Sequence, residues 1–332
     1  MGKPDPMIGL LCLAAAAPSI HISVDRPTHR IVVDAGAGGY QAFPDVCRLK
    51  NGELMCVFYA GYTHISYPTP SLPRGGRICA IRSIDEGQTW SAPKTILDTP
   101  EDDRDPSICC LPNGVMLCNF FTYRKGGAAD TMLARSADGG ETWSDPELIL
   151  PSFATSTPIR RLRSGRLLMA VYTVDGAGRK YAATIVSDDA GKTWSSPHPI
   201  GLNAGKTIDE TDFFERKDGT ILAISREVMT SSESRDGGVT WSEARDLGFA
   251  GHCPYLLMTK QGVLFLAHRV PQTSLHYSLD EGRTWSENVP IDDVIGAYPS
   301  MVQLKDGRVL CVYYEEGERS AIREAFIRIR IG

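Results

Sequence analysis

The chain has 332 residues, of which 42% are apolar and 23% are charged, so it can bury a core of ordinary size and is neither disordered nor of low complexity. Thirty-five Lys and Arg residues against 40 Asp and Glu residues give a net charge of −5, which argues against the broad basic surface that nucleic-acid binding requires. The nine cysteines form no CxxC pair and no Cys/His ligand spacing, so we expect no metal site and few or no disulfides.

The chain begins with a segment that resembles an export signal. Residues 7–20, MIGLLCLAAAAPSI, are mostly apolar, follow Lys3 and contain small residues near Ala17, as secretion signals do. The segment is too short and too rich in Ala for a membrane span. We therefore expect residues 1–20 to be a signal peptide or a disordered N-terminus, residues 21–332 to form a single domain, and the location to be secreted or periplasmic rather than cytoplasmic.

Six segments that begin between Pro44 and Pro299 have the pattern of a β-hairpin. Each has an apolar strand, a polar turn that contains Gly, and a second apolar strand, as in PDVCRLKNGELMCVFY from Pro44. This pattern is the usual sequence signal of a tight hairpin. The turn glycines are Gly52, Gly114, Gly165, Gly219, Gly262 and Gly307.

A second repeat alternates with the hairpins. The string Ser-x-Asp-x-Gly-x-Thr-Trp occurs five times and contains all five tryptophans. Its Asp is expected to accept backbone N–H bonds, its Gly to adopt a positive φ, and its Trp to bury its ring beneath the turn. Calcium binding is disfavoured because each copy lacks the alternating ligands and the distal Glu of a calcium loop. The copies start at Ser83, Ser136, Ser187, Ser234 and Ser278.

One hairpin followed by one Trp turn makes a unit of four antiparallel strands. Six such units at intervals of roughly 50 residues predict an all-β fold, a six-bladed β-propeller with four antiparallel strands per blade. The sixth unit has no Trp turn and ends in the strand-like AFIRIRI from Ala325. We expect the early strand HRIVVDA, residues 29–35, to complete that sheet and so close the ring.

Strand direction predicts which face carries a site. Both turns of a unit lie on one face, so the opposite face receives the start of each first strand and the end of each second strand. Arginines, carboxylates and aromatic rings together suit an anionic, sugar-like ligand. The candidates before first strands are Asp103, Arg104, Asp105, Glu210, His252 and Tyr298, and those after second strands include Tyr62, His64, Arg226 and Arg269.

The first unit carries a long loop, residues 60–77, on the same face. Three prolines stiffen this loop, and His64, Arg74 and Arg77 lie where they could reach a ligand. The alternative is a surface loop without a function.

The Ser-x-Asp-x-Gly-x-Thr-Trp repeats resemble the Asp boxes of the sialidase (neuraminidase) superfamily, and the resemblance covers about residues 30–332. It implies hydrolysis of a terminal sialic acid with retention, by a Tyr nucleophile paired with a Glu, an Asp acid/base and three Arg that bind the carboxylate. Tyr298, in GAYPSMVQLKDG, resembles the nucleophile, and Glu210, in DETDFFERKDG, resembles its partner. Arg226 and Arg269 resemble two of the three arginines.

The first blade departs from the family pattern. The family has an Arg in a Tyr-Arg-Ile-Pro-like string, whereas this chain has YQAFP from Tyr40. Arg74 and Gly75 stand in the zone where the family has its acid/base Asp. Candidates for the third Arg are Arg104, Arg74 and Arg77, and candidates for the acid are Asp103 and Asp105.

The favoured function is therefore a sialidase-like exo-glycoside hydrolase that removes a terminal acidic sugar from an acidic glycan or glycoconjugate. Two alternatives stay open: a lyase or hydrolase of uronate-containing polysaccharide, with Tyr298, His64 or His252 as acid/base, and a glycan-binding propeller without turnover. No cofactor is expected, because no glycine loop for phosphate leads from a strand into a helix.

Overall fold

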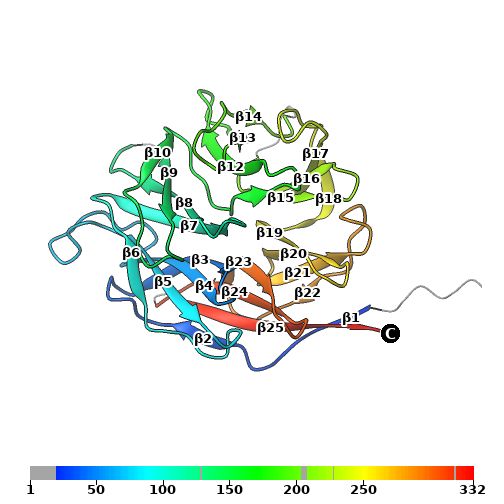
Figure 1. The fold of residues 1–332 in the computed structure, drawn as a ribbon, viewed down its shortest axis with the longest axis horizontal. Helices are drawn as coiled ribbons and strands as arrows, with labels where there is room; N and C mark the ends of the chain where they lie inside the picture. Colours follow the sequence, from blue (N-terminus) through cyan, green and yellow to red (C-terminus); the bar gives the residue numbers. More distant parts are fainter. Residues whose placement is uncertain (1–19, 128, 203–207, 227, 318) are drawn as a thin grey trace, which may run out of the picture.

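Six antiparallel sheets stand around a common axis like the blades of a propeller (Figure 1). This computed structural model describes residues 20–332 except 128, 203–207, 227 and 318. The predicted all-β, six-bladed fold is confirmed. Blades one to three consist of β3 (Tyr40–Arg48), β4 (Leu54–Gly61), β5 (Arg77–Ser83) and β6 (Lys94–Leu97); β7 (Asp102–Cys110), β8 (Met116–Tyr123), β9 (Ala129–Ser136) and β10 (Glu147–Leu150); and β11 (Arg160–Arg161), β12 (Leu167–Val174), β13 (Lys180–Ser187) and β14 (His198–Pro199).

Blades four to six follow the same plan, and the six predicted hairpins form the first two strands of each blade. The first strands line the axis, since β3 contacts the first strands of both neighbouring blades, β7 and β23. These three blades consist of β15 (Thr211–Glu215), β16 (Ile221–Ser225), β17 (Val228–Ser234) and β18 (Arg245–Ala250); β19 (His252–Met258), β20 (Leu264–Arg269), β21 (Ser274–Ser278) and β22 (Val289–Pro290); and β23 (Gly296–Gln303), β24 (Val309–Glu315) and β25 (Ala321–Ile331), which β1 (Ile20–Val24) and β2 (His29–Val32) complete.

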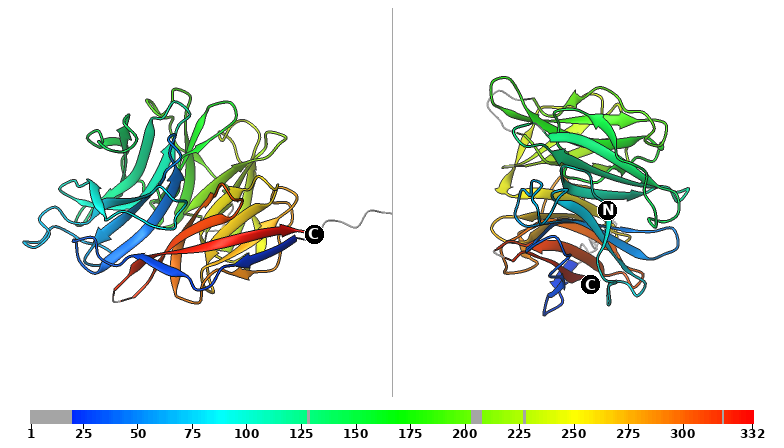
Figure 2. Two further views of the ribbon diagram at one scale, coloured as in Figure 1. Left: turned by 60° about the horizontal axis from the view of Figure 1, so that its bottom comes forward. Right: turned by 90° about the vertical axis from the view of Figure 1, so that its left-hand side faces the viewer.

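The two ends of the described chain close the ring in blade six. The predicted early strand forms as β2 and pairs with β25, where His29 lies opposite Glu324. A further strand, β1, extends the same edge, with Ile20 opposite Ile331. Figure 2 shows these N-terminal strands, in blue, beside the C-terminal strand, in red. We did not predict β1, because its first residues continue the apolar segment that we assigned to the signal.

The five Trp turns have one hydrogen-bond design. In the first, the Thr89 backbone N–H and hydroxyl donate to the two oxygens of Asp85 at 2.9 and 2.6 Å, and these bonds lower the pKa of that carboxyl. Gly87 has a φ of +84° and donates its N–H to Ser83 Oγ at 2.8 Å. The predicted turn chemistry is confirmed, but the Trp rings are half-buried rather than fully buried. They pack against the cores between blades.

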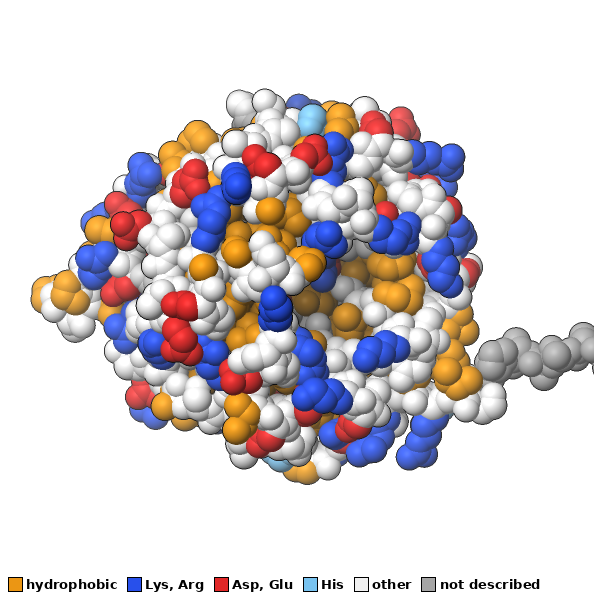
Figure 3. Space-filling model, in the orientation of Figure 1, with side chains coloured by type: hydrophobic (Ala, Val, Ile, Leu, Met, Phe, Trp, Pro, Cys, Tyr) orange, Lys and Arg blue, Asp and Glu red, His pale blue; other side chains and the backbone are white. Residues whose placement is uncertain are grey.

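Apolar clusters between neighbouring blades form the core, and a hollow lies near the centre of the face shown in Figure 3, among hydrophobic and basic side chains. Close to the axis, two buried carboxylates join the blades. Asp45 accepts from Ser300 Oγ of blade six at 2.5 Å and from the Ile108 N–H of blade two at 2.7 Å. Asp212 accepts from Arg160 of blade three at 2.7 Å and from the Leu256 N–H of blade five at 2.6 Å. Each carboxylate therefore links its own blade to both neighbours.

The N-terminal segment assigned to a signal lies outside the described residues, apart from Ile20. Within the described part of the chain, no helix has the length and apolar character that crossing a membrane requires. The eight cysteines of that part are all free thiols. The same residues contain no group of three or more His, Cys, Asp or Glu placed to hold a metal ion.

Asp212→Ala is expected to destabilise the protein by about 3 kcal/mol, because it removes a fully buried carboxylate that binds the half-buried Arg160 guanidinium and the Leu256 N–H. Urea unfolding followed by Trp fluorescence measures this loss. Asp218→Ala is the matched control, since its ion pair with Arg283 is about half exposed on both sides and contributes at most about 1 kcal/mol. Equal losses in the two variants would contradict the role assigned to Asp212.

Candidate active site

The six inner strands bring one register position to the propeller axis. In four blades the residue before the inner-strand proline has a positive φ, namely Phe43 (+54°), Asp105 (+47°), Cys253 (+55°) and Tyr298 (+50°). The strand pairing shifts register at each of these points, which marks a β-bulge that redirects a side chain. The four residues line a narrow space at the axis.

Glu210 occupies the same position in blade four. Thr211 stands as many residues before the turn Gly219 as Pro44 stands before Gly52, so the residue before Thr211 corresponds to Tyr298. This equivalence brings a carboxylate and a phenol from blades four and six to the same level of the axis.

Tyr298 and Glu210 are hydrogen-bonded. The Tyr298 hydroxyl donates to Glu210 Oε1, and Arg226 Nη1 donates to the same oxygen at 2.8 Å. Glu210 is 4% exposed, and its second oxygen, Oε2, accepts no hydrogen bond from the part of the chain that the structure describes. Burial and the Glu210 charge raise the pKa of the Tyr298 phenol well above its usual range. The phenol therefore keeps its proton at neutral pH and points it at a carboxylate.

Two arginines approach the site from the ends of second strands, as predicted. Arg226 directly follows β16, and Arg269 ends β20 of the neighbouring blade. Arg269 Nη2 lies 3.4 Å from His252 Nδ1, and its Nη1 lies 3.9 Å from a carboxylate oxygen of Glu316. Both guanidinium charges act on the buried Cys253 thiol, whose pKa is nevertheless raised by burial. The two arginines thus converge near the axis.

A third guanidinium, Arg104, comes from blade two and is 5% exposed. Its Cζ lies 5.2 Å from the centroid of the Phe43 ring, and its Nη2 lies 3.1 Å from His64 Nε2. The Phe43 ring also contacts Tyr298, with centroids 4.9 Å apart. Arg104, His64 and Tyr298 therefore surround one aromatic ring, and no described residue accepts a hydrogen bond from the buried Nε of Arg104.

The two candidate acids face different surroundings. Asp105 is 3% exposed and accepts from Ser156 Oγ at 3.0 Å, while its Oδ1 accepts no hydrogen bond from residues 20–332 as far as they are described. Burial raises its pKa to about 7, although the Arg104 charge opposes that shift. Asp103 instead accepts from the backbone N–H and hydroxyl of Thr99 at 2.6 and 2.7 Å. The structure places Asp105 at the axis and turns the buried Asp103 to Thr99, in the connection between β6 and β7.

The long loop of blade one brings one predicted ligand residue, His64, to the site. The other predicted residues hold the loop itself: Arg74 donates to the Asp98 carbonyl at 2.8 Å, Arg77 to the Ala35 carbonyl at 3.0 Å, and Tyr62 to the Tyr67 carbonyl at 3.0 Å. No hydrogen bond or ion pair between described residues joins any of the three to the Tyr298 and Glu210 pair.

A cavity of about 610 Å³ lies between blades two and three, on the side of the site that Arg104 and His64 form. His64 and Arg104 belong to its wall, as does Tyr172, whose hydroxyl lies 2.9 Å from Ser156 Oγ. This cavity provides room for a ligand that extends from the axis. Its wall also includes Ile65, Phe121, Tyr123, Ala154, Val174 and Lys180.

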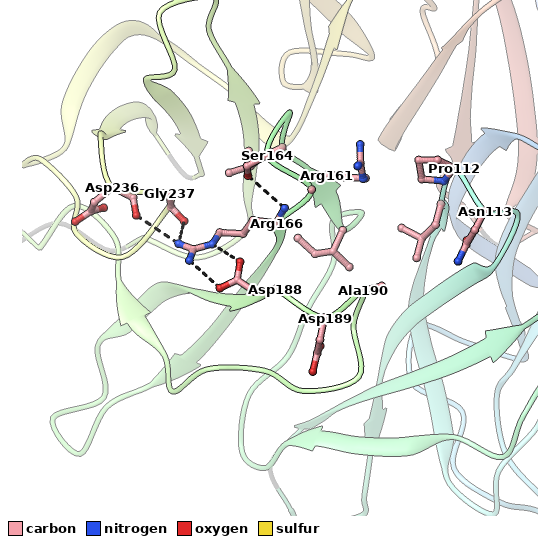
Figure 4. A pocket seen from close by; sticks show the side chains of 14 residues that line it. Pro112, Asn113, Arg161, Ser164, Arg166, Asp188, Asp189, Ala190, Asp236 and Gly237 are labelled. Atoms are coloured by element: carbon pink, nitrogen blue, oxygen red, sulfur yellow. Dashed lines mark hydrogen bonds and ion pairs between the residues drawn. The ribbon is translucent and has the colours of Figure 1, made fainter.

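A second cavity, of about 650 Å³, lies at the opposite ends of the strands (Figure 4). It is formed by the hairpin turn of blade three, which includes Ser164, and by Trp turns. Arg166 binds Asp188 there through two hydrogen bonds of 2.8 Å and faces the Asp236 and Gly237 carbonyls (Figure 4). Because Arg166 and Asp188 bind each other, and Asp189 and Asp236 accept hydrogen bonds from threonines of their own turns, this cavity is a weaker candidate for a ligand site.

The sequence reasoning did not assign Phe43, Ser156 or Cys253 to the site. The signal for two of them was present, because Phe43 and Cys253 precede a proline at the register position of Tyr298. Comparison of the six hairpins at that single position would have found both residues.

Comparisons with known proteins agree with this architecture. Residues 80–311 match the family model of the BNR repeat-like domain. A sialidase of Micromonospora viridifaciens is 25% identical over 84% of this chain and 51% of its own length, so the chain spans about half of that relative. A Dyadobacter fermentans protein of unknown function aligns with a TM-score of 0.80 and 22% identity, over 93% of this chain and 99% of its own. Trypanosoma rangeli sialidase in complex with sialic acid aligns with a TM-score of 0.69 and 16% identity, over 92% and 58%.

Asp105→Asn is expected to gain stability relative to the natural protein as the pH rises from 4 to 8. The folded-state pKa of Asp105 is raised to about 7, so its neutral form stabilises the fold at low pH and this contribution is lost as the pH rises through 7. The variant cannot ionise, and its relative gain should reach roughly 3 kcal/mol. Urea unfolding across this pH range measures it, with Asp218→Asn as the exposed control; a difference that does not change with pH would contradict the burial of a titrating carboxyl.

Proposed function

Because the chain belongs to the family of BNR repeat-like domains, we propose that it is a sialidase-like exo-glycoside hydrolase, which removes a terminal acidic sugar from an acidic glycan or glycoconjugate. The observation that carries the proposal is the buried hydrogen bond between Tyr298 and Glu210, with Arg226 on the same carboxylate oxygen. The sialidase name of the Micromonospora viridifaciens relative supports it. The apolar segment at residues 7–20 supports action in a secreted or periplasmic location.

The arginines account for the choice of an acidic sugar. Arg226 and Arg269 bind the substrate carboxylate from blades four and five, and Arg104 approaches from blade two. Buried N–H and carboxylate atoms without partners cost free energy unless a ligand or water satisfies them. Arg226 Nε and Arg104 Nε are two such atoms at the site, without a hydrogen bond to any described residue, and an anionic ligand supplies acceptors for both.

A phenol suits this substrate better than a carboxylate nucleophile would. A negatively charged nucleophile would be repelled by the carboxylate of the sugar, whereas Tyr298 is neutral before it attacks. A neutral phenol is itself a weak nucleophile, so it needs a base that removes its proton as the new bond forms. Glu210 Oε1 already accepts that hydrogen bond.

In the first step the Tyr298 oxygen attacks the anomeric carbon and its proton passes to Glu210. The bond from that carbon to the leaving oxygen breaks, and Asp105 gives the leaving oxygen a proton. In the second step water attacks the same carbon and returns a proton to Asp105, while the released Tyr298 oxygen takes its proton back from Glu210. Each displacement inverts the carbon, so the product retains the original configuration.

Three observations favour Asp105 as the proton donor. It lies at the same register position as Tyr298, its Oδ1 has no hydrogen-bond partner among the described residues, and burial raises its pKa to about 7. A carboxyl with such a pKa is partly protonated at neutral pH, which general acid catalysis requires. We expect activity to fall as the pH rises above 7, because Asp105 then loses the proton that it donates.

Tyr298→Phe is expected to lower kcat on a fluorogenic α-sialoside at least about a thousandfold, which corresponds to about 4 kcal/mol of barrier. Fluorescence of the released phenol measures turnover. The variant should still bind N-acetylneuraminic acid in calorimetry, since all three arginines remain. Tyr277→Phe is the matched control, because its half-buried ring packs near a Trp turn at the opposite ends of the strands.

Turnover that persists in Tyr298→Phe would remove the proposed nucleophile. An unsaturated product from a uronate-containing polysaccharide, detected by ultraviolet absorbance, would instead identify a lyase. Glycan binding without any product from a panel of acidic glycosides would identify a binding propeller. The first result overturns the proposed mechanism, and each of the other two overturns the hydrolase proposal.

Asp105→Asn is expected to affect substrates according to their leaving groups. An alkyl α-sialoside, whose leaving oxygen needs a proton, should lose about 100-fold or more in turnover. An aryl α-sialoside with an acidic phenol should lose much less. Asp103→Asn is the control, since that carboxylate is held by Thr99; equal losses on both substrates in Asp105→Asn would contradict the role of Asp105 as the acid.

A further inference from the structure

A chain of hydrogen bonds runs along the rim of the site from blade two to blade six. Arg104 Nη2 lies 3.1 Å from His64 Nε2, and His64 Nδ1 lies 2.9 Å from the Tyr40 hydroxyl. The Tyr40 hydroxyl in turn lies 3.1 Å from Glu316 Oε1. Tyr314 donates to the other oxygen of Glu316 at 2.6 Å. The long loop of blade one supplies His64, the central member of this chain.

The donors and acceptors of this chain allow only one direction. An ionised carboxylate such as Glu316 only accepts, so Tyr40 gives it the single hydroxyl proton and accepts from His64 Nδ1–H. A neutral imidazole has one N–H, which leaves a lone pair on Nε2. The Arg104 guanidinium can only donate, and it donates to that lone pair. His64 is therefore neutral, with its proton on Nδ1.

We propose that His64 is a positioning residue that holds the Arg104 guanidinium over the Phe43 ring beside Tyr298, and so provides from blade two the third guanidinium that blade one lacks. The statement that this guanidinium meets the acidic group of a substrate rests on the proposed function. The statement that His64 orients it does not.

The surroundings of Arg104 show why it needs such a partner. Its nearest carboxylate contact, Asp105 Oδ1, is 3.7 Å away, beyond hydrogen-bond distance. Aromatic rings surround the rest of the guanidinium, with centroids 5.2 to 5.8 Å from Cζ at Phe43, Tyr59 and Phe121. These faces attract a cation but do not fix its rotation. The directional bond to His64 Nε2 does.

The loop is built to hold His64 still. Ser66 Oγ accepts from the Tyr62 N–H at 2.9 Å, and the Ser66 N–H donates to Asp102 Oδ2 of blade two at 3.1 Å. Gly76 lets the returning chain pass close to blade two, because a Cβ there would collide with Asp102 and Tyr59. The first bond closes the loop around His64, and the other two contacts hold the residues that follow His64 against the neighbouring blade.

Protonation of His64 breaks the chain. A proton on Nε2 would face the Arg104 N–H, so two donors and two positive charges would oppose each other. Burial and the Arg104 charge lower the pKa of His64; the Arg269 charge acts in the same direction, and the charges of Glu316 and Glu210 oppose it. Tyr40 and Phe43 complete the groups that face the ring. The orientation of Arg104 is therefore kept at neutral pH and lost as the pH falls through the His64 pKa.

NMR of the full chain labelled with ¹⁵N-histidine tests the orientation without any substrate. His64→Gln identifies the His64 signals by their loss. We expect the Nδ1–H tautomer at pH 7 and a pKa below that of an unperturbed histidine. The Nε2–H tautomer, or an imidazolium at pH 7, would overturn the proposal whatever the protein hydrolyses.

Two variants test the consequence for ligand binding. His64→Phe keeps a ring but removes both nitrogens, whereas His64→Gln keeps an acceptor for Arg104 and cannot titrate. With an aryl α-sialoside, we expect KM to rise about tenfold in His64→Phe with a smaller change in kcat. His64→Gln should recover most of this loss and show a weaker dependence of KM on acid pH. His198→Phe, on the outer strand of blade three, is the control for histidine loss.

The failures of the two proposals are distinguishable. If the natural protein neither hydrolyses the sialoside nor binds N-acetylneuraminic acid, the proposed function fails, while the NMR tautomer still decides the His64 to Arg104 bond. If the natural protein is active, an unchanged KM in His64→Phe would overturn the positioning role. So would a KM in His64→Gln as high as that in His64→Phe, with thermal unfolding used to verify that both variants are folded.

Discussion

The candidate site depends on the closure of the ring. Tyr298 and Glu210 lie 88 residues apart in the chain, and they meet because the inner strands stand around one axis, in a ring whose last blade is completed by β1 and β2 from the other end of the described chain. The buried carboxylates Asp45 and Asp212 then tie their own blades to both neighbours. Close to the axis, positive φ values at the residue before the proline aim four side chains inward. Such conformations cost about 1–3 kcal/mol each, and the rigid ring sustains them.

Much of the fold follows from the sequence because each repeat carries its own physical reason. The Trp turns need an acceptor at Asp and a positive φ at Gly, and both are visible in the string that contains Asp85 and Gly87. The strand at residues 29–35 was predicted from the sixth unit, which lacks its outer strand. The pairing of Tyr298 with Glu210 followed from strand direction together with the family resemblance. These features depend on local chemistry or on counting strands.

The rest depends on contacts that no local pattern encodes. Arg74 and Arg77 looked as available to a ligand as His64 did, but backbone carbonyls of Asp98 and Ala35 hold them. Asp103 and Asp105 lie two residues apart, and simple alternation would place them on the same face. A bulge between Arg104 and Ser107 shifts the pairing, so Asp105 turns to the axis while Asp103 binds Thr99. Neither the contacts of the two arginines nor the different directions of the two carboxylates follow from the local sequence.

In the proposed mechanism the Tyr298 oxygen forms a covalent bond to the sugar. Trapping this glycosyl-enzyme intermediate tests the role of Tyr298 most directly. The natural protein would be incubated with 2,3-difluorosialic acid, digested and analysed by mass spectrometry of its peptides. We expect a glycosyl adduct on the peptide that contains Tyr298, attached to the phenol oxygen of that residue. The adduct should be absent in Glu210→Gln. Turnover of a sialoside by a protein that forms its adduct on another residue, or none at all, would contradict this role of Tyr298.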